Sequence, residues 1–395
     1  MQARKNFLQN PFFIIGIIVL IIIIVSAQSL LLGLKTFTAD GIKYTHYNNY
    51  IIFKESFFHL IQGKDLYVLY PQEHWDLYKY SPAFSLLMAP FALLPDFIGL
   101  TLWNLLNGLV LVFALQKLPV TSQKKNIYFI GFILIELITS LQNTQSNALI
   151  AGLIIFAFLF LEKKNIFLAA LCIVLTIYIK IFGIVALSIF IFYPGKLKAV
   201  LYTAGWAFFF AFLPLVVISF SQLSFLYKSW LSLLQNDHDA SLGLSVMGWL
   251  QSWFNINISK NIIVLTGAAL FCVPLLKYRL YNNVAYKLFF LSSILLWIVI
   301  FNHKAESPTF IIAVTGVAIW YFSQARTIVN MVLILLVFVF TILSPTDIFP
   351  AYIRNNYVFP YVLKGVPCIL VWFKLMYDMI FFKRRSHSNF FSPSL

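Results

Sequence analysis

Long apolar runs recur along the whole chain and constrain its fold more than any other feature. Residues 11–34 contain no charged side chain, and further apolar runs follow after short polar connectors. About 20 residues of α-helix span the hydrocarbon core of a bilayer, so this pattern predicts many membrane crossings. Charged residues make up 10% of the chain, whereas a soluble domain carries about 25%. The sequence therefore predicts an all-α polytopic membrane protein.

The lengths of the apolar runs predict roughly 11–13 transmembrane helices in one membrane domain over residues 1–395. Residues 81–94 form a short stretch that ends in Pro90 and Pro95, which favours a re-entrant segment or a further short span. Residues 166–193 are expected to form one span or two broken halves. The expected spans lie near 11–34, 97–116, 127–141, 148–161, 166–193, 199–222, 261–276, 285–301, 307–322, 325–343 and 356–382.

Charge is distributed unequally between alternate connectors. The net charge is +15, and the Lys and Arg residues cluster in short connectors and tails, which the positive-inside rule places in the cytoplasm. This placement argues against a nucleic-acid partner and makes membrane lipid the expected environment. Both termini, including a basic tail over 383–395, are expected in the cytoplasm, and the run over 11–34 is expected to be a retained span in a plasma (inner) membrane. Two long loops, 35–80 and 223–258, then lie outside the cytoplasm.

The outward face carries the residues suited to chemistry, because most carboxylates, tyrosines and tryptophans of the connectors lie there. Within the first loop, residues 50–61 have an uneven apolar face interrupted by Lys54, Glu55 and His59, a pattern compatible with a helix lying on the membrane surface. We therefore expect extracytoplasmic loop helices next to the membrane, with the functional site beside them.

Two charged residues fall inside apolar runs. Lys180 lies within 166–193, where an ammonium is costly unless it faces a cavity or a partner, and it suits a phosphate or pyrophosphate. Snorkelling to the interface is the alternative for a broken helix. Glu136 lies within 127–141, where it can pair with a basic residue, carry a proton or pack in its protonated form; we favour a structural role.

Polar segments between the later spans supply further candidates. Residues 302–308 place His303, Lys304 and Glu306 together on the outward side, and either His303 or Glu306 suits a general base. Gln145 and Asn147 offer the uncharged donors and acceptors that sugar hydroxyls require, although amides also cap helices. These segments predict an outward site for a polar ligand.

No metal or other cofactor is expected. The acids and histidine of 236–239 can be read as a metal site, but residues so close on a loop more often form a turn. Cys172, Cys272 and Cys368 lie in apolar runs without metal-ligand spacing and are interpreted as packing residues. The sequence has no phosphate-binding glycine-rich loop. An activated substrate is therefore expected to arrive through the membrane on a lipid carrier.

An ordered series of short motifs runs through the chain. It comprises Asn49-Tyr50, Gly63-Lys64-Asp65-Leu66-Tyr67, Tyr78-Lys79-Tyr80-Ser81-Pro82, Pro90, Leu94-Pro95, Trp103-Asn104, Asn107, Gln145-x-Asn147, Lys180, Trp230, Ser241, Ser245 and His303. In order and spacing these motifs resemble those of glycosyltransferase family 87, over about residues 1–310.

This resemblance implies a GT-C helical bundle with an extracytoplasmic active site. It implies a polyprenyl-phosphate sugar as donor, a mannose-like or arabinofuranose-like sugar, and a glycolipid or glycan acceptor, with inversion at the transferred carbon. On this basis Lys180 and Lys304 are expected to bind the donor phosphate. The residues expected to contact the sugar or the acceptor are Asn49, Tyr80, Gln145, Asn147 and Trp230.

The sequence departs from the family pattern at the expected base. Counting back from Gly63, the aspartate of the family falls on Asn49, whose amide does not accept a proton. Asp40 is the first substitute, Glu55 the second, and Glu306 with His303 the third; Asp65 and Asp76 look structural. A transporter or flippase of lipid-linked glycan and a catalytically inactive family member are the alternative functions.

Overall fold

The computed structural model describes residues 11–37, 41–119, 123–237 and 241–382. These residues are overwhelmingly helical, with a small antiparallel pairing of β1 (Lys35–Thr36) and β2 (Lys43–Tyr44). Within these described ranges, three helical stretches are long and apolar enough to cross a membrane, at Phe12–Leu31, Asp96–Gln116 and Lys196–Val216, and eight further apolar helices are shorter. The predicted all-α membrane fold is therefore confirmed, while the number of crossings stays a prediction.

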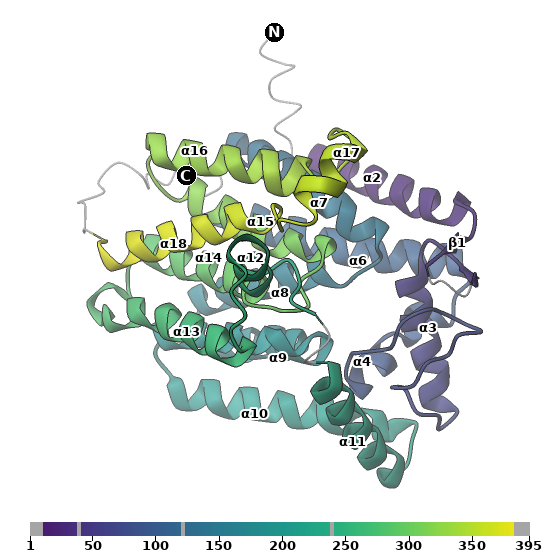
Figure 1. Cartoon of the computed structure of the whole chain (residues 1–395). Helices are drawn as coiled ribbons and strands as arrows, with labels where there is room; N and C mark the ends of the chain where they lie inside the picture. The colour runs from purple at the N-terminus through teal and green to yellow at the C-terminus, as the bar shows by residue number, and fades with distance from the viewer. Residues whose placement is uncertain (1–10, 38–40, 120–122, 238–240, 383–395) are drawn as a thin grey trace.

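The long helices form a bundle in which they run from side to side in Figure 1. Short polar connectors join neighbouring helices, because backbone groups within an apolar environment must be paired inside each helix. The bundle helices are α2 (Pro11–Leu31), α6 (Asp96–Gln116), α7 (Gln123–Gln142), α8 (Asn147–Glu162), α9 (Ile166–Ile179), α10 (Lys196–Phe212), α13 (Lys260–Cys272), α14 (Val284–Ile300), α15 (Phe310–Phe322), α16 (Ile328–Leu336) and α18 (Val366–Ile380).

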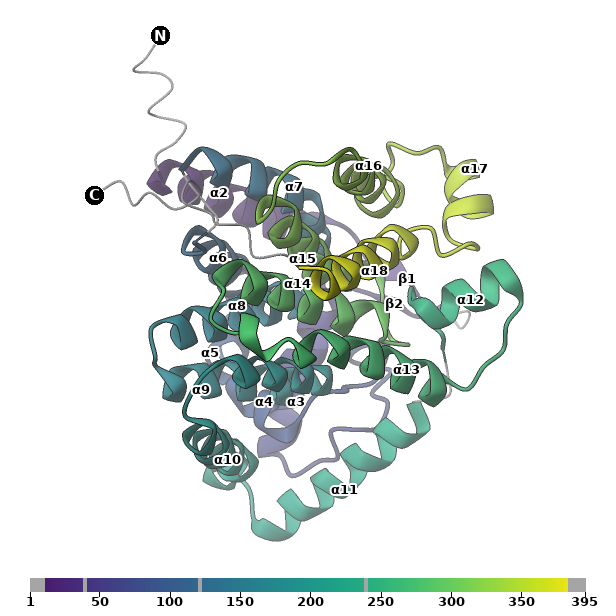
Figure 2. The ribbon, with the colours of Figure 1, turned by 90° about the vertical axis from the view of Figure 1, so that its left-hand side faces the viewer.

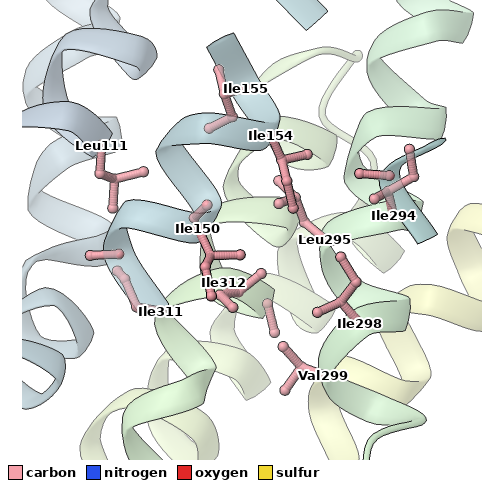
Figure 3. Packing of buried hydrophobic residues seen from close by; sticks show 14 of the residues in the cluster. Leu111, Ile150, Ile154, Ile155, Ile294, Leu295, Ile298, Val299, Ile311 and Ile312 are labelled. Carbon is pink, nitrogen blue, oxygen red and sulfur yellow. The ribbon is translucent and has the colours of Figure 1, made fainter. Parts of the chain in front are cut away.

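Helices α8, α14 and α15 form the centre of the bundle. Their branched aliphatic side chains interdigitate, with Ile150, Ile298 and Ile312 among the buried residues drawn in Figure 3. Gly152 of α8 lets α6 approach closely, since a Cβ atom there would lie 2.8 Å from the backbone nitrogen of Leu111. Small residues at such crossings allow the backbones of two membrane helices to approach closely and to pack over a larger area.

Several helices outside the bundle gather at one end of it, at the right of Figure 1. They are α3 (Asn48–Ile61), α4 (Pro82–Leu87), α5 (Ala89–Ala92) and α11 (Phe220–Asp237), with α12 (Val246–Phe254) lying outside the bundle next to α13. Figure 2 shows α11 and α12 on the periphery. The apolar face of α3 packs against α4 and α5, burying Tyr50, Phe53 and Leu60, so protein covers the face that we expected on the membrane surface.

Three expected segments take a more specific form than the sequence indicated. The run 166–193 is two halves, because Lys180 has an extended backbone between α9 and the 3-10 helix η1 (Ile181–Phe192). The stretch 81–94 forms the short helices α4 and α5, each with proline in its first turn. The expected last span, 356–382, contains a regular helix only from Val366, since residues 359–365 form turns that include Val362 with φ +53°.

Candidate functional site

The break between α9 and η1 places Lys180 at the centre of a polar site. Its extended backbone (φ −143°, ψ 123°) leaves the helical path, while its N–H still donates to the carbonyl of Thr176 over 2.8 Å. Gly183 permits this bend, because a Cβ atom at that position would lie 2.4 Å from Oγ1 of Thr176. The local sequence therefore ends the helix and presents one ammonium group there.

Amide side chains hold the ammonium in place. Lys180 Nζ donates to Oδ1 of Asn147 over 2.9 Å and to Oε1 of Gln145 over 3.3 Å. Asn147 Nδ2 also donates to Oε1 of Gln145, over 2.6 Å. Both partners are neutral, so they orient the ammonium without cancelling its charge. The positive charge remains available to an anionic ligand.

The same network connects the ammonium to a carboxylate. Gln145 Nε2 donates to Oε2 of Glu306 over 3.1 Å, so a single amide bridges Lys180 and Glu306. Gln145 is 9% exposed and Asn147 is fully buried, whereas Glu306 is exposed. The structure thus brings together four predicted site residues from the connector before α8, the start of α8, the break after α9, and the connector before α15.

Aromatic rings cover one side of the ammonium. Lys180 Nζ lies 5.7 Å from the ring centroid of Tyr80 and 5.8 Å from that of Phe182, within the range of cation–π attraction. Tyr80 is held by an edge contact with Phe53 and by stacking on Phe84. These contacts fix the orientation of the aromatic wall.

The motif Tyr78–Pro82 positions that wall. Ser81 caps α4 by accepting from the N–H of Phe84 over 3.2 Å, and its hydroxyl donates to the carbonyl of Tyr178 over 2.6 Å. Trp230 of α11 donates from Nε1 to the carbonyl of Lys79 over 3.2 Å. Trp230 therefore supports the segment beside Tyr80, and its ring is half-buried at the border of the site.

A second connector is tied to the one that carries Glu306. Leu244 N–H donates to the carbonyl of Ala305 over 2.8 Å, and the hydroxyl of Ser241 donates to the carbonyl of His303 over 2.8 Å. The backbone of Lys304 donates to Oδ1 of Asn302 over 2.9 Å. His303 and Lys304 therefore lie on the same fixed connector as Glu306.

The remaining candidates lie in different places. Asn49 Nδ2 donates to the carbonyl of Asn143 over 2.9 Å, which places it beside the segment that carries Gln145. Glu55 belongs to a separate cluster with His59 and Glu73. Phe53 contacts Tyr80, and Glu55, two residues further along α3, points to another side of the helix. Asp40 lies outside the described residues, as do His238 and Asp239 of the segment considered as a metal site.

Burial affects the cluster on α3. The pKa of Glu55 is raised by burial and by the nearby carboxylate of Glu73, and the pKa of His59 is lowered by burial. We did not single out this cluster from the sequence. The spacing of Glu55 and His59, one helical turn apart, is the signal that indicates it.

Two other expectations have direct structural counterparts. Glu136 forms a buried ion pair with Lys364, with Oε1 and Nζ 2.7 Å apart, which agrees with the structural role that we favoured. Asp65 accepts from the hydroxyl of Ser229 over 2.9 Å and from the N–H of Tyr67 over 3.0 Å, so it joins the loop that follows α3 to α11.

The sequence was compared with protein-family models and with curated proteins. The family model of glycosyltransferase family 87 matches residues 78–345, more than half of the chain. The matched range contains Tyr80, Gln145, Asn147, Lys180 and Glu306. No curated protein matches the sequence significantly.

Proposed function

Because the chain belongs to glycosyltransferase family 87, we propose that it moves one sugar from a polyprenyl monophosphate to an acceptor outside the cytoplasm. The transferred sugar is mannose-like or arabinofuranose-like, and the acceptor is a glycolipid or a glycan. One observation carries the proposal: a single amide, that of Gln145, contacts both the Lys180 ammonium and the Glu306 carboxylate. Such a site offers a cation for the leaving phosphate and a base for the acceptor.

Lys180 is the proposed phosphate ligand. A lipid monophosphate leaves when the bond between its oxygen and the anomeric carbon breaks, and the phosphate keeps the electron pair. A fixed ammonium stabilises the charge that develops on that oxygen. Lys304, on the connector that carries Glu306, is proposed to bind the same phosphate from the other side.

Glu306 is the proposed base, because its carboxylate is exposed and fixed by Gln145. It accepts the proton of the acceptor hydroxyl while the hydroxyl oxygen forms the new bond to the anomeric carbon. His303, three residues earlier, is proposed to assist this proton transfer, and Asp40 stays a prediction for the role of base. Glu55 is a weaker candidate because it belongs to the other cluster.

The neutral polar and aromatic side chains are proposed to bind the sugar and the acceptor. Tyr80 and Trp230 offer flat apolar faces for a sugar ring or an isoprenoid chain, and Gln145 and Asn147 offer amides for hydroxyl groups. Asn49, whose side-chain amide donates to the neighbouring carbonyl of Asn143, is proposed to contact the acceptor.

The proposed topology puts this site outside the cytoplasm, with both termini inside and the chain in the plasma (inner) membrane. The distribution of basic connectors supports this orientation. A donor carried by a polyprenyl chain reaches such a site by lateral movement within the lipid, so a soluble nucleotide-binding domain is not needed.

The test is a transfer assay with the purified protein, a panel of synthetic polyprenyl-phosphate sugars and candidate acceptors. We expect Glu306→Gln to reduce the turnover by about 10²–10⁴-fold, the usual contribution of a general base. Lys54→Met is the matched control, because the Lys54 ammonium is already paired with Asp96 at 2.7 Å. Asp40→Asn, measured in parallel, decides between the two acids.

Two outcomes contradict the proposal. Absence of transfer from every lipid-phosphate sugar, together with absence of donor binding, refutes the donor class. Full activity of Glu306→Gln refutes the assignment of the base, even when transfer itself is observed.

A further inference from the structure

The second polar cluster at the outward end has the composition of a metal site. Glu55 and His59 stand one turn apart on α3, and Glu73 comes from the loop that follows the helix. One oxygen of each carboxylate and one imidazole nitrogen lie within 4.8 Å of one another. A ligand set of this kind suits a divalent transition-metal ion such as zinc.

The buried histidine points into this cluster. His59 is 3% exposed, and its Nε2 atom lies 2.8 Å from Oε2 of Glu73. Even so, Nε2 has no aligned hydrogen-bond partner within the described part of the chain. The ion pair with Glu73 requires a protonated imidazole, whereas a metal ion between the three side chains would bind the nitrogen of the neutral imidazole directly.

The charges in the cluster also favour a cation. The carboxylates of Glu55 and Glu73 repel each other, which is one cause of the raised pKa of Glu55. The Lys54 ammonium opposes a cation here, but it is paired with Asp96, whose carboxylate acts in the opposite direction. Lys64 also opposes a cation, so two ammonium groups stand against the three carboxylates of Glu55, Glu73 and Asp96.

The surroundings supply both support and access. The ring of Tyr70 packs on the His59 ring with centroids 3.9 Å apart, and the N–H of Glu73 donates to the carbonyl of Tyr70 over 2.9 Å. These contacts fix the orientation of the imidazole ring and the backbone turn from Tyr70 to Glu73. Glu73 is exposed, so an ion can enter from solvent, and water can complete the coordination.

We propose that Glu55, His59 and Glu73 bind one divalent transition-metal ion that fixes the first outward loop to α3. The loop leads directly to Tyr80, which covers Lys180, so the ion stabilises one wall of the candidate site without taking part in sugar transfer. The inference concerns a separate cluster and does not depend on the proposed function.

The test measures metal binding by protein that was purified without a polyhistidine tag, stripped with a chelator and titrated with Zn²⁺ against a competing chromophoric chelator. We expect one bound ion per chain and a higher midpoint of thermal unfolding when Zn²⁺ is present, because an ion that binds the folded state stabilises it. Mn²⁺ and Mg²⁺ are titrated in parallel, and Mg²⁺ is expected to bind more weakly because it prefers oxygen ligands.

The variants Glu73→Gln and His59→Gln are expected to weaken Zn²⁺ binding at least tenfold and to abolish the thermal shift. Glu73 is exposed, so its replacement leaves the fold intact and the test remains decisive if His59→Gln fails to fold. Asp76→Asn in the same loop and His46→Gln before α3 are the matched controls and should bind like the wild type. Absence of Zn²⁺ binding by the wild type, or equal binding by Glu73→Gln, overturns the proposal.

Discussion

The buried pair of Glu136 and Lys364 gives the most quantitative prediction. Glu136 lies on α7 and Lys364 precedes α18, and their side chains are only 1% and 4% exposed. Solvent therefore does not screen the contact, in contrast to a surface pair. The second carboxylate oxygen of Glu136 is buried without a hydrogen-bond partner among the described residues. Removing Lys364 thus leaves a carboxylate with no compensation.

Loss of one member of such a pair costs about 3–5 kcal/mol, whereas replacing both with apolar residues is often close to neutral. We therefore expect Glu136→Leu and Lys364→Met each to lower the free energy of unfolding by about 3–5 kcal/mol. The double variant should lose clearly less than the sum of the two single changes. Denaturant titration in detergent micelles, with all four proteins of the cycle, measures the coupling.

The ion pair of Asp347 and Arg354, in which the carboxylate is exposed, is the matched control. The Asp347 side chain is 98% exposed, so Asp347→Asn should leave the free energy of unfolding unchanged within error. Small additive effects at Glu136 and Lys364 would refute the reasoning from burial. The cycle also addresses transport, because a proton carrier at Glu136 would make the double variant inactive, whereas a structural pair leaves sugar transfer intact.

Two further predictions concern the close packing of helices and the attachment of the loop after α3 to α11. Gly152→Ala should destabilise the protein by about 1–3 kcal/mol through overpacking, since the new Cβ would lie 2.8 Å from the backbone nitrogen of Leu111; Gly131→Ala, where no atom lies within 4 Å, should be neutral or stabilising in the same thermal unfolding assay. Asp65→Asn should lower the unfolding midpoint because it weakens the charge-assisted bonds to α11 and to the loop backbone. Asp76→Asn should leave the unfolding midpoint unchanged, since asparagine tolerates the left-handed backbone there (φ +75°) and the ion pair with Lys79 is partly exposed. Equal losses for the two glycine variants would contradict the packing argument, and equal losses for the two aspartate variants would contradict the role of Asp65.

The membrane fold and most helix positions follow from the sequence, because a long apolar run is stable only as a helix that is buried, either in lipid or in protein. The run over 148–161, for example, corresponds to α8 with a difference of one residue at each end. The sequence predicts that the last span begins at residue 356, whereas the regular helix α18 begins at Val366. Residues 359–365 are largely apolar, yet they form turns that composition does not distinguish from helix.

The candidate site was predictable in its residue types but not in its connections. Lys180 is recognisable because a charge inside an apolar run is costly without a partner. Gln145 and Asn147 are recognisable as uncharged donors and acceptors between two spans and from the family resemblance. The bridge from Gln145 to Glu306 joins residues 161 positions apart, and the partner of Glu136 lies 228 positions away. Such contacts depend on how helices pack, which a single sequence does not specify.

Binding of a polyprenyl monophosphate without a sugar tests the central claim most directly, because it measures the role of Lys180 apart from catalysis. In lipid nanodiscs, Lys180→Met should bind this ligand with about 1.5–3 kcal/mol less free energy, the contribution of a hydrogen bond to a charged group, or roughly 10–150-fold more weakly than the wild type. Lys54→Met should bind like the wild type. Equal affinity of Lys180→Met and the wild type would contradict the account.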